Sequence, residues 1–164
     1  FDEIKSWIRR VANETKADVC LVEIGGTVGD IESMPFLEAI RQMQNEEKDE
    51  DFVLIHVTLV PIDSCGEQKT KPTQHSVKEV RGIGLHPDVI VCRCKEKLRE
   101  STKRKISLFC DVPVEAVVSA DDADDIYEVP LKFKEEHLDE YLVNKMHLND
   151  KQKSNQWTEI VEKW

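Results

Sequence analysis

The sequence has 164 residues, with 33 acidic and 23 basic side chains, a formal net charge of −10, and 40% hydrophobic and 34% charged residues. This balance is typical of a globular chain that buries one core, and it excludes a disordered segment. No apolar run approaches the roughly 20 residues that span a bilayer, and an acidic chain lacks the basic surface that nucleic acid favours. We therefore expect neither a membrane nor a nucleic acid as a partner.

The five cysteines are odd in number and form no CxxC pair. Because no apolar signal segment opens the chain, we interpret the cysteines as reduced thiols and predict a cytoplasmic location. The first residue is Phe1 rather than methionine, so we expect the chain to be a section of a longer protein.

The first third of the chain predicts a helix, a strand, a helix and a strand. Residues 1–11 place hydrophobic side chains at helical spacing. The run ADVCLVEI, residues 17–24, is short, apolar and β-branched, and predicts a strand covered on both faces. Residues 32–47 predict a helix with Pro35 in its first turn, and DFVLIHVTLVP, residues 51–61, predicts a second buried strand.

The same alternation continues after a polar loop. Thr73 is expected to cap the next helix, which Gly84 ends. Residues 87–94 predict a third strand, 95–110 a charged helix, and 115–120 a fourth strand. This order predicts the α/β fold class, a parallel sheet with flanking helices and right-handed crossovers.

An acidic, glycine-rich loop follows the first predicted strand. Glu23 ends the strand, three glycines come next, and Asp30 and Glu32 follow. Ligands of open parallel sheets bind at the carboxyl ends of strands, where carboxylates hold Mg²⁺ or accept hydrogen bonds from hydroxyl and amino groups. The alternative is that Asp30 only caps a helix and the glycines only make a turn.

A basic loop follows the second predicted strand. GEQKTKPTQHSVKEVR, residues 66–81, concentrates lysines and an arginine in an otherwise acidic chain. Two ammonium groups with the donors of a helix N-terminus suit a polyphosphate, although a lone basic loop is also typical of solvated surface. Together, the acidic and basic loops predict a site for a nucleotide with its metal ion.

Two kinds of reactive-looking side chain are interpreted as structural. Cys65 lacks the flanking pattern of an activated nucleophile, and at least one of Cys92 and Cys94 is expected in the core. His56 lies inside a predicted strand, where a hydrogen-bonded core histidine is expected.

The strings VEIGGTVGDIES, KTKPTQHSVKEVR and KISLFCDVP closely resemble the amidoligase (synthetase) domain of the CTP synthase family. The resemblance covers about residues 17–130 and extends more loosely to 164, in the central and C-terminal part of that domain only. It implies a P-loop-NTPase-like or Rossmann-like three-layer architecture, truncated at the N-terminus. It also implies a nucleotide-binding part over 1–130 and peripheral helices over 131–164 that lead to a glutaminase domain missing here.

Enzymes of this family use ATP as co-substrate to phosphorylate O4 of UTP, and ammonia from the glutaminase domain then displaces phosphate to give CTP. The resemblance therefore implies Mg²⁺ as cofactor, UTP, CTP and ATP as ligands, and a homotetramer when full length. The chain itself lacks the G-x-x-x-x-G-K-[ST] phosphate loop and is expected to bind UTP or CTP without turnover. Alternatives are a truncated, non-catalytic nucleotide-binding or assembly partner, and another ATP-dependent ligase of the same broad fold.

Carried over by motif, the resemblance implies Glu23 as a magnesium ligand and no catalytic residue in this chain. The other implied site residues contact nucleotides. They are Asp30, Ile31 and Glu32 for CTP, then Lys69, Thr70, Lys71, Pro72, Thr73, Gln74 and Lys105 for UTP or CTP, and Asp121, Asp122 and Ala123 for ATP.

Overall fold

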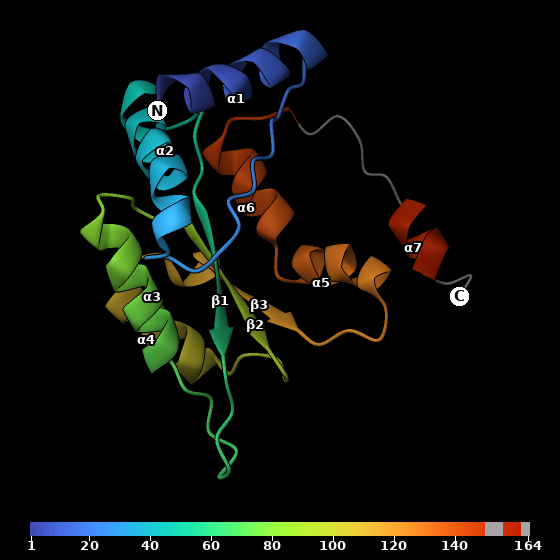
Figure 1. Cartoon of the computed structure of the whole chain (residues 1–164). Coiled ribbons are helices and arrows are strands. Elements are labelled where there is room, and N and C mark those ends of the chain that lie inside the picture. The colour runs from blue at the N-terminus through green and yellow to red at the C-terminus, as the bar shows by residue number, and fades with distance from the viewer. Residues whose placement is uncertain (150–155, 162–164) are drawn as a thin grey trace.

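A computed structural model describes residues 1–149 and 156–161 of the chain (Figure 1). Within them lies a three-stranded parallel sheet of β1 (Ile55–Val60), β2 (Val89–Cys94) and β3 (Val117–Asp121), in the order β1-β2-β3. The register pairs Val57 with Val91 and Val91 with Val118. The sheet therefore has β2 at its centre.

Helices connect and surround the strands. They are α1 (Asp2–Thr15), α2 (Met34–Glu46), α3 (Lys71–Gly82), α4 (Glu100–Cys110), α5 (Val129–Glu135), α6 (Leu138–Lys145) and α7 (Gln156–Val161), with short 3₁₀ turns η1 (Ile31–Ser33), η2 (Val114–Ala116) and η3 (Ile126–Glu128). None of the helices in the described part of the chain combines the length and the apolar character that a membrane span needs.

The sheet is covered on both faces, because side chains of β2 alternate between two cores. Ile90 and Cys92 belong to a buried cluster that includes Val77 of α3 and Ile106 of α4. Val91 belongs to a second cluster on the opposite face, against which side chains of α5 and α6 pack. Figure 1 accordingly shows α3 and α4 on one side of the sheet and α5 and α6 on the other. The α/β fold class with three layers is confirmed.

A third cluster joins the first two helices to the end of α3. Ile40 and Met43 of α2 contact Val80 and Leu85, and partly buried side chains from α1 and from the loop before α2 pack against them. Lys5 of α1 donates hydrogen bonds to Gln42 and Glu46 at 2.9 and 2.7 Å. The amphipathic opening helix predicted from the sequence is confirmed.

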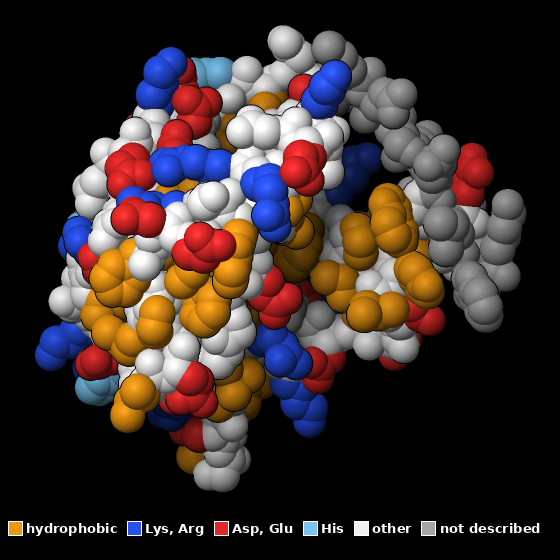
Figure 2. All heavy atoms as spheres, turned by 45° about the horizontal axis from the view of Figure 1, so that its top comes forward, with side chains coloured by type: hydrophobic (Ala, Val, Ile, Leu, Met, Phe, Trp, Pro, Cys, Tyr) orange, Lys and Arg blue, Asp and Glu red, His pale blue; other side chains and the backbone are white. Residues whose placement is uncertain are grey.

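The strand predicted over residues 17–24 is wrong. The segment has no regular secondary structure and pairs with no strand among the described residues, and Leu21 is 91% exposed. A parallel strand forms only where a neighbouring strand satisfies its N–H and C=O groups, and apolar sequence alone supplies no such neighbour. Figure 2 shows exposed hydrophobic side chains interspersed with acidic and basic ones on one face of the molecule.

Helix α3 begins within residues 66–81, earlier than predicted. It starts at Lys71 with Pro72 in its first turn, so Thr70 rather than Thr73 occupies the N-cap position. Thr73 is fully buried, and its hydroxyl accepts a hydrogen bond from Thr58 and donates one to the carbonyl of Leu59. Pro72 explains the earlier start, because the fixed φ of proline suits the first helical turn.

Candidate functional site

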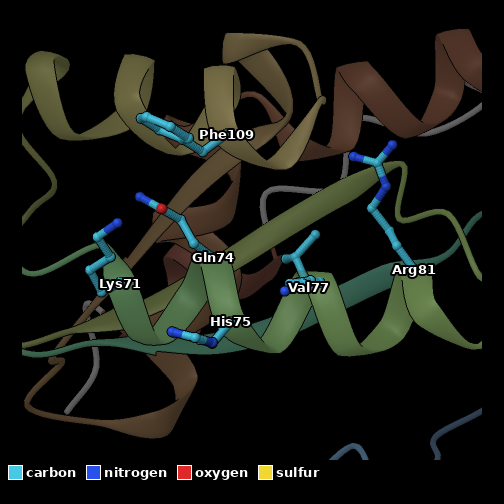
Figure 3. A pocket seen from close by; sticks show the side chains of 7 residues that line it. Lys71, Gln74, His75, Val77, Arg81 and Phe109 are labelled. Atoms are coloured by element: carbon cyan, nitrogen blue, oxygen red, sulfur yellow. The ribbon is translucent and has the colours of Figure 1, made fainter.

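A groove of about 380 Å³ lies along α3 and reaches the last turn of α4. Its lining is rich in cationic and polar side chains, with one aromatic ring. The lining residues are Lys71, Gln74, His75, Val77, Lys78, Arg81 and Phe109. Figure 3 shows Gln74 and Arg81 rising from α3 on the side where Phe109 of α4 lies.

Helical spacing explains why these side chains gather. Positions three and four residues apart share one face of a helix, so Lys71, Gln74 and Lys78 form a row along α3. Lys71 opens this 12-residue helix, where the free N–H groups add a partial positive charge to that of the ammonium group. The groove therefore suits an anionic ligand that also carries a flat or apolar part for Phe109.

Lys69 and Lys71 of the basic loop differ in their surroundings. The ammonium group of Lys69 forms ion pairs with Asp63, at 2.9 Å, and with Glu67. The hydrogen bonds that Lys69 donates to Glu67 and Asp63 raise the pKa of Lys69, and the bond to Asp63 lowers the pKa of Asp63. Lys71, in contrast, lines the groove with no ion-pair partner in the described ranges 1–149 and 156–161. Lys71 is thus available to a ligand in the groove, whereas Lys69 is held by carboxylates of its own loop.

Gln68, which the sequence reasoning missed, anchors the base of this loop. Its side chain is buried, accepts a hydrogen bond from the N–H of Arg99 at 3.0 Å and donates to the carbonyl of Lys97 at 3.0 Å. A glutamine beside a lysine carries no signal of burial in the sequence, because its partners lie about 30 residues away along the chain.

The remaining residues predicted for UTP or CTP lie around the start of α3 and on α4. Thr70 accepts a hydrogen bond from Gln74 at 2.9 Å, whereas the hydroxyl of Thr73 points into the core. Lys105 is exposed on α4, one helical turn before Phe109 and on the same face. Lys105 therefore lies on the helix face that closes the groove, although it does not line the groove itself.

A second cavity, of about 440 Å³, lies at the carboxyl end of the sheet. Asp121, Asp122 and Ala123, predicted for ATP, all line it. Its floor is apolar, from Val57, Val91 and the helix α5, and Arg93 adds a cation that the sequence reasoning did not assign to a site. The sequence gives only the period-two alternation that puts Arg93 on the strand face opposite Cys92 and Cys94, and it does not show what packs on that face.

Asp121 carries its charge at the edge of this cavity. Lys132 of α5 donates a hydrogen bond to it at 2.6 Å. Burial alone would raise the pKa of Asp121, but the Lys132 hydrogen bond, a backbone hydrogen bond and the charges of Lys132 and Lys97 together hold the pKa below its usual value. An apolar floor with charged groups at the rim is typical of a cavity that takes a heterocycle with polar substituents.

The acidic loop lines neither cavity. The carboxylate of Asp30 accepts the N–H of Thr27 at 2.9 Å and so closes a tight turn, while Ile31 is 86% exposed. Glu23 and Glu32 are exposed as well. Across the part of the chain that the structure describes, no three His, Cys, Asp or Glu side chains gather as a metal site. The structure thus brings Lys71, Gln74 and Phe109 together, but not the acidic loop with them.

A comparison with protein families and relatives decides the classification. The family model described as CTP synthase N-terminus matches residues 1–148. The chain belongs to the CTP synthase family. The match is to the N-terminus of CTP synthases, and it does not carry the finer prediction that the chain covers only the central and C-terminal part of an amidoligase domain.

Three similar relatives are each named CTP synthase. The protein of Archaeoglobus fulgidus is 71% identical over 162 residues, covering 99% of this chain and 30% of the relative. That of Methanococcoides burtonii is 64% identical over 160 residues, covering 98% and 30%. That of Natronomonas pharaonis is 54% identical over 165 residues, covering 98% and 30%. The chain therefore spans about 30% of the length of these CTP synthases.

Proposed function

We propose that this chain is the pyrimidine-nucleotide-binding portion of the amidoligase domain of a CTP synthase, and that the groove along α3 holds the triphosphate of UTP or CTP. The observation that carries the proposal is the row of Lys71, Gln74 and Lys78 beside Phe109, in a chain that belongs to the CTP synthase family. Cations and a helix N-terminus offset the phosphate charge, and the aromatic ring offers a surface for the base.

ATP would occupy the second cavity. Its apolar floor suits the adenine ring, and Arg93 with the backbone of residues 121–123 offers polar contacts at the rim. Two polyphosphates that meet in one reaction repel each other, and cationic side chains offset that repulsion. The protein would act by positioning and charge neutralisation, with no covalent nucleophile of its own.

The acidic loop would contribute the metal ligand and the CTP contacts. Mg²⁺ is commonly held by one or two carboxylates together with phosphate oxygens and water, so the exposed carboxylate of Glu23 fits as one ligand. When bound, the ion would neutralise phosphate charge. Because Asp30, Ile31 and Glu32 line neither cavity of this chain, we propose that a second copy brings them to the basic groove in a homotetramer.

Charge and shape support this use of a second copy. The loop presents an exposed isoleucine between two acidic side chains, and the groove presents cationic side chains beside a phenylalanine. Opposite charges across an interface fix its register and suppress wrong partners. The nucleotide site would then be complete only in the assembly.

We expect the chain alone to bind UTP or CTP with Mg²⁺ and to make no CTP. It spans about 30% of its relatives, and glutamine-derived ammonia would come from a domain outside this chain. The test is calorimetric titration with UTP and CTP, each with Mg²⁺, of the wild-type chain, of Lys71→Gln, and of the control Lys134→Gln on exposed α5 surface.

Loss of the Lys71 charge should weaken nucleotide binding about 10-fold, since a charge-assisted hydrogen bond contributes on the order of 1.5 to 3 kcal/mol. Lys134→Gln carries the same charge change away from the groove and should bind as the wild type does. Equal affinities of wild type and Lys71→Gln would remove the groove from the nucleotide site.

A further inference from the structure

A buried carboxylate outside both cavities joins three elements of the fold. The Glu136 side chain, directly after α5, is only 5% exposed. It accepts a hydrogen bond from Lys103 of α4, a second from the backbone N–H of Ser119 at 2.9 Å, and it lies 3.1 Å from the ammonium group of Lys97. Burial alone would raise the pKa of Glu136, but these donors hold the pKa below its usual value, so the carboxylate is charged at neutral pH.

The N–H that Glu136 accepts belongs to a sheet edge. β3 pairs with β2 on one side only within the described residues, so its outward N–H groups need another acceptor. Glu136 supplies one at Ser119, two residues before Asp121 of the second cavity. The Glu136 carboxylate thus holds β3 in place, and β3 carries Asp121 at the rim of the second cavity.

A path of hydrogen bonds continues from Ser119 to the basic loop. The hydroxyl of Ser119, which is fully buried, accepts the N–H of Leu98 at 3.0 Å. The residues on either side of Leu98 hold Gln68, through the carbonyl of Lys97 and the N–H of Arg99. Gln68 directly precedes the segment that opens α3 at the groove.

We propose that Glu136 is a positioning residue that couples the basic loop at the α3 groove to the second cavity at the end of β3. Its charge holds Lys103 on α4, the edge of β3 and, through Ser119, the segment that anchors Gln68. Helix α4 contributes Phe109 to the groove and β3 contributes Asp121 to the second cavity, while Glu136 and the segment that anchors Gln68 line neither. This coupling rests on the proposed function only for the identity of the ligands that the two cavities bind.

The test is backbone hydrogen exchange in Glu136→Gln, with Glu135→Gln as the matched control. Each substitution removes one negative charge, and the two positions are adjacent in the sequence. Glu135, however, is exposed. The glutamine amide keeps one acceptor oxygen and places an NH₂ group beside the donors that the carboxylate served. Reporter amides are Ser119, Arg99, and Lys69, whose N–H donates to the carbonyl of Pro61 at 2.8 Å. Val91 of the central strand reports global opening.

We expect Glu136→Gln to speed exchange about 10-fold at Ser119, Arg99 and Lys69 while Val91 stays unchanged, and Glu135→Gln to change none of them. Faster exchange at Ser119 alone would show a local cap without coupling and would overturn the proposal. Faster exchange at Val91 by the same factor would show general destabilisation and would overturn it too.

Nucleotide titration separates this inference from the proposed function. In Glu136→Gln we expect the Kd for UTP to rise about 5-fold although the residue lies outside the groove, because coupling through packed networks is typically of this size. A wild-type chain that binds no UTP would contradict the proposed function, and the exchange pattern alone would then decide the coupling. A Kd unchanged from wild type in Glu136→Gln would count against the coupling.

Discussion

A carboxylate oxygen of Asp63 lies 2.9 Å from the ammonium group of Lys69 and so forms an ion pair with the first lysine of the basic loop. The same carboxylate also accepts the N–H groups of Cys65 and Glu67, each at 2.9 Å. Asp63 therefore builds the turn and restrains the lysine at once.

Asp63→Asn separates these two roles. The asparagine oxygen keeps the acceptor for the turn, while the loss of charge removes one of the two ion pairs of Lys69. The pair with Glu67 remains, but Lys69 becomes more available to a phosphate. We expect UTP to bind about 3-fold more tightly, since a partly exposed ion pair is worth about 0 to 1 kcal/mol. Calorimetry at low salt measures this, and Asp51→Asn, an exposed site outside the loop, is the control. Weaker binding in Asp63→Asn would show that the restrained Lys69 is the state that the ligand needs.

Phe109 and Leu108 offer a matched pair on α4. Both side chains are exposed, at 57% and 76%, but only Phe109 lines the groove. Phe109→Ala should weaken UTP binding about 10-fold through loss of stacking with the base, whereas Leu108→Ala should leave the Kd unchanged. Equal effects of the two substitutions would point to a general role of this α4 surface, such as contact with a second copy.

His56 gives a pH dependence of stability. It is partly buried, shares a hydrogen bond of 2.8 Å with Ser76, and burial lowers its pKa. The unfolded chain therefore binds a proton at His56 more readily than the folded chain does. Below the ordinary pKa of about 6.5, the free energy of unfolding should fall as pH falls, until the folded-state pKa is reached.

Thermal unfolding of the wild type and of His56→Gln between pH 5 and pH 8 measures this contribution. Glutamine keeps a hydrogen-bonding group toward Ser76 and does not titrate. The wild type should lose stability relative to His56→Gln as pH falls through this window. Parallel stability curves would mean that His56 does not supply the pH dependence.

The cysteines should divide into two classes toward an alkylating reagent. Burial raises the pKa of Cys92 to about 12 and that of Cys110 to about 11, and Cys94 is buried as well. Cys20 and Cys65 are exposed. Mass spectrometry after iodoacetamide treatment should find Cys20 and Cys65 modified in the native chain, and the other three only after denaturation. Native modification of Cys92 would contradict the packing between the sheet and its α3 and α4 layer.

Patterns that act locally could be predicted from the sequence. Helical spacing predicted α1, and apolar runs predicted the segments that became β2 and β3. The expectations that His56 is hydrogen-bonded within a strand, and that at least one of Cys92 and Cys94 lies in the core, are also confirmed. In each of these cases the signal lies in a residue and its near neighbours along the chain.

The role of a predicted cap residue and the pairing of a predicted strand depended on residues that are distant in the sequence. Thr73 was expected to cap α3, but it is buried and hydrogen-bonds with Thr58 and Leu59 of β1, about 15 residues earlier in the chain. Residues 17–24 carry the composition of a strand, yet no neighbouring strand meets them in the described residues.

The sequence by itself determined which chemical groups this protein offers, because a lysine-rich loop, a glycine-rich acidic loop and the strings of the CTP synthase family are read directly along the chain. Only the tertiary structure decided that Lys69 is held by Asp63 while Lys71 faces the groove, and that Gln68 and Glu136 are buried anchors. The physical reason is that the charge state and reach of a side chain depend on the groups packed around it. Those groups come from segments tens of residues apart, which only the fold brings together.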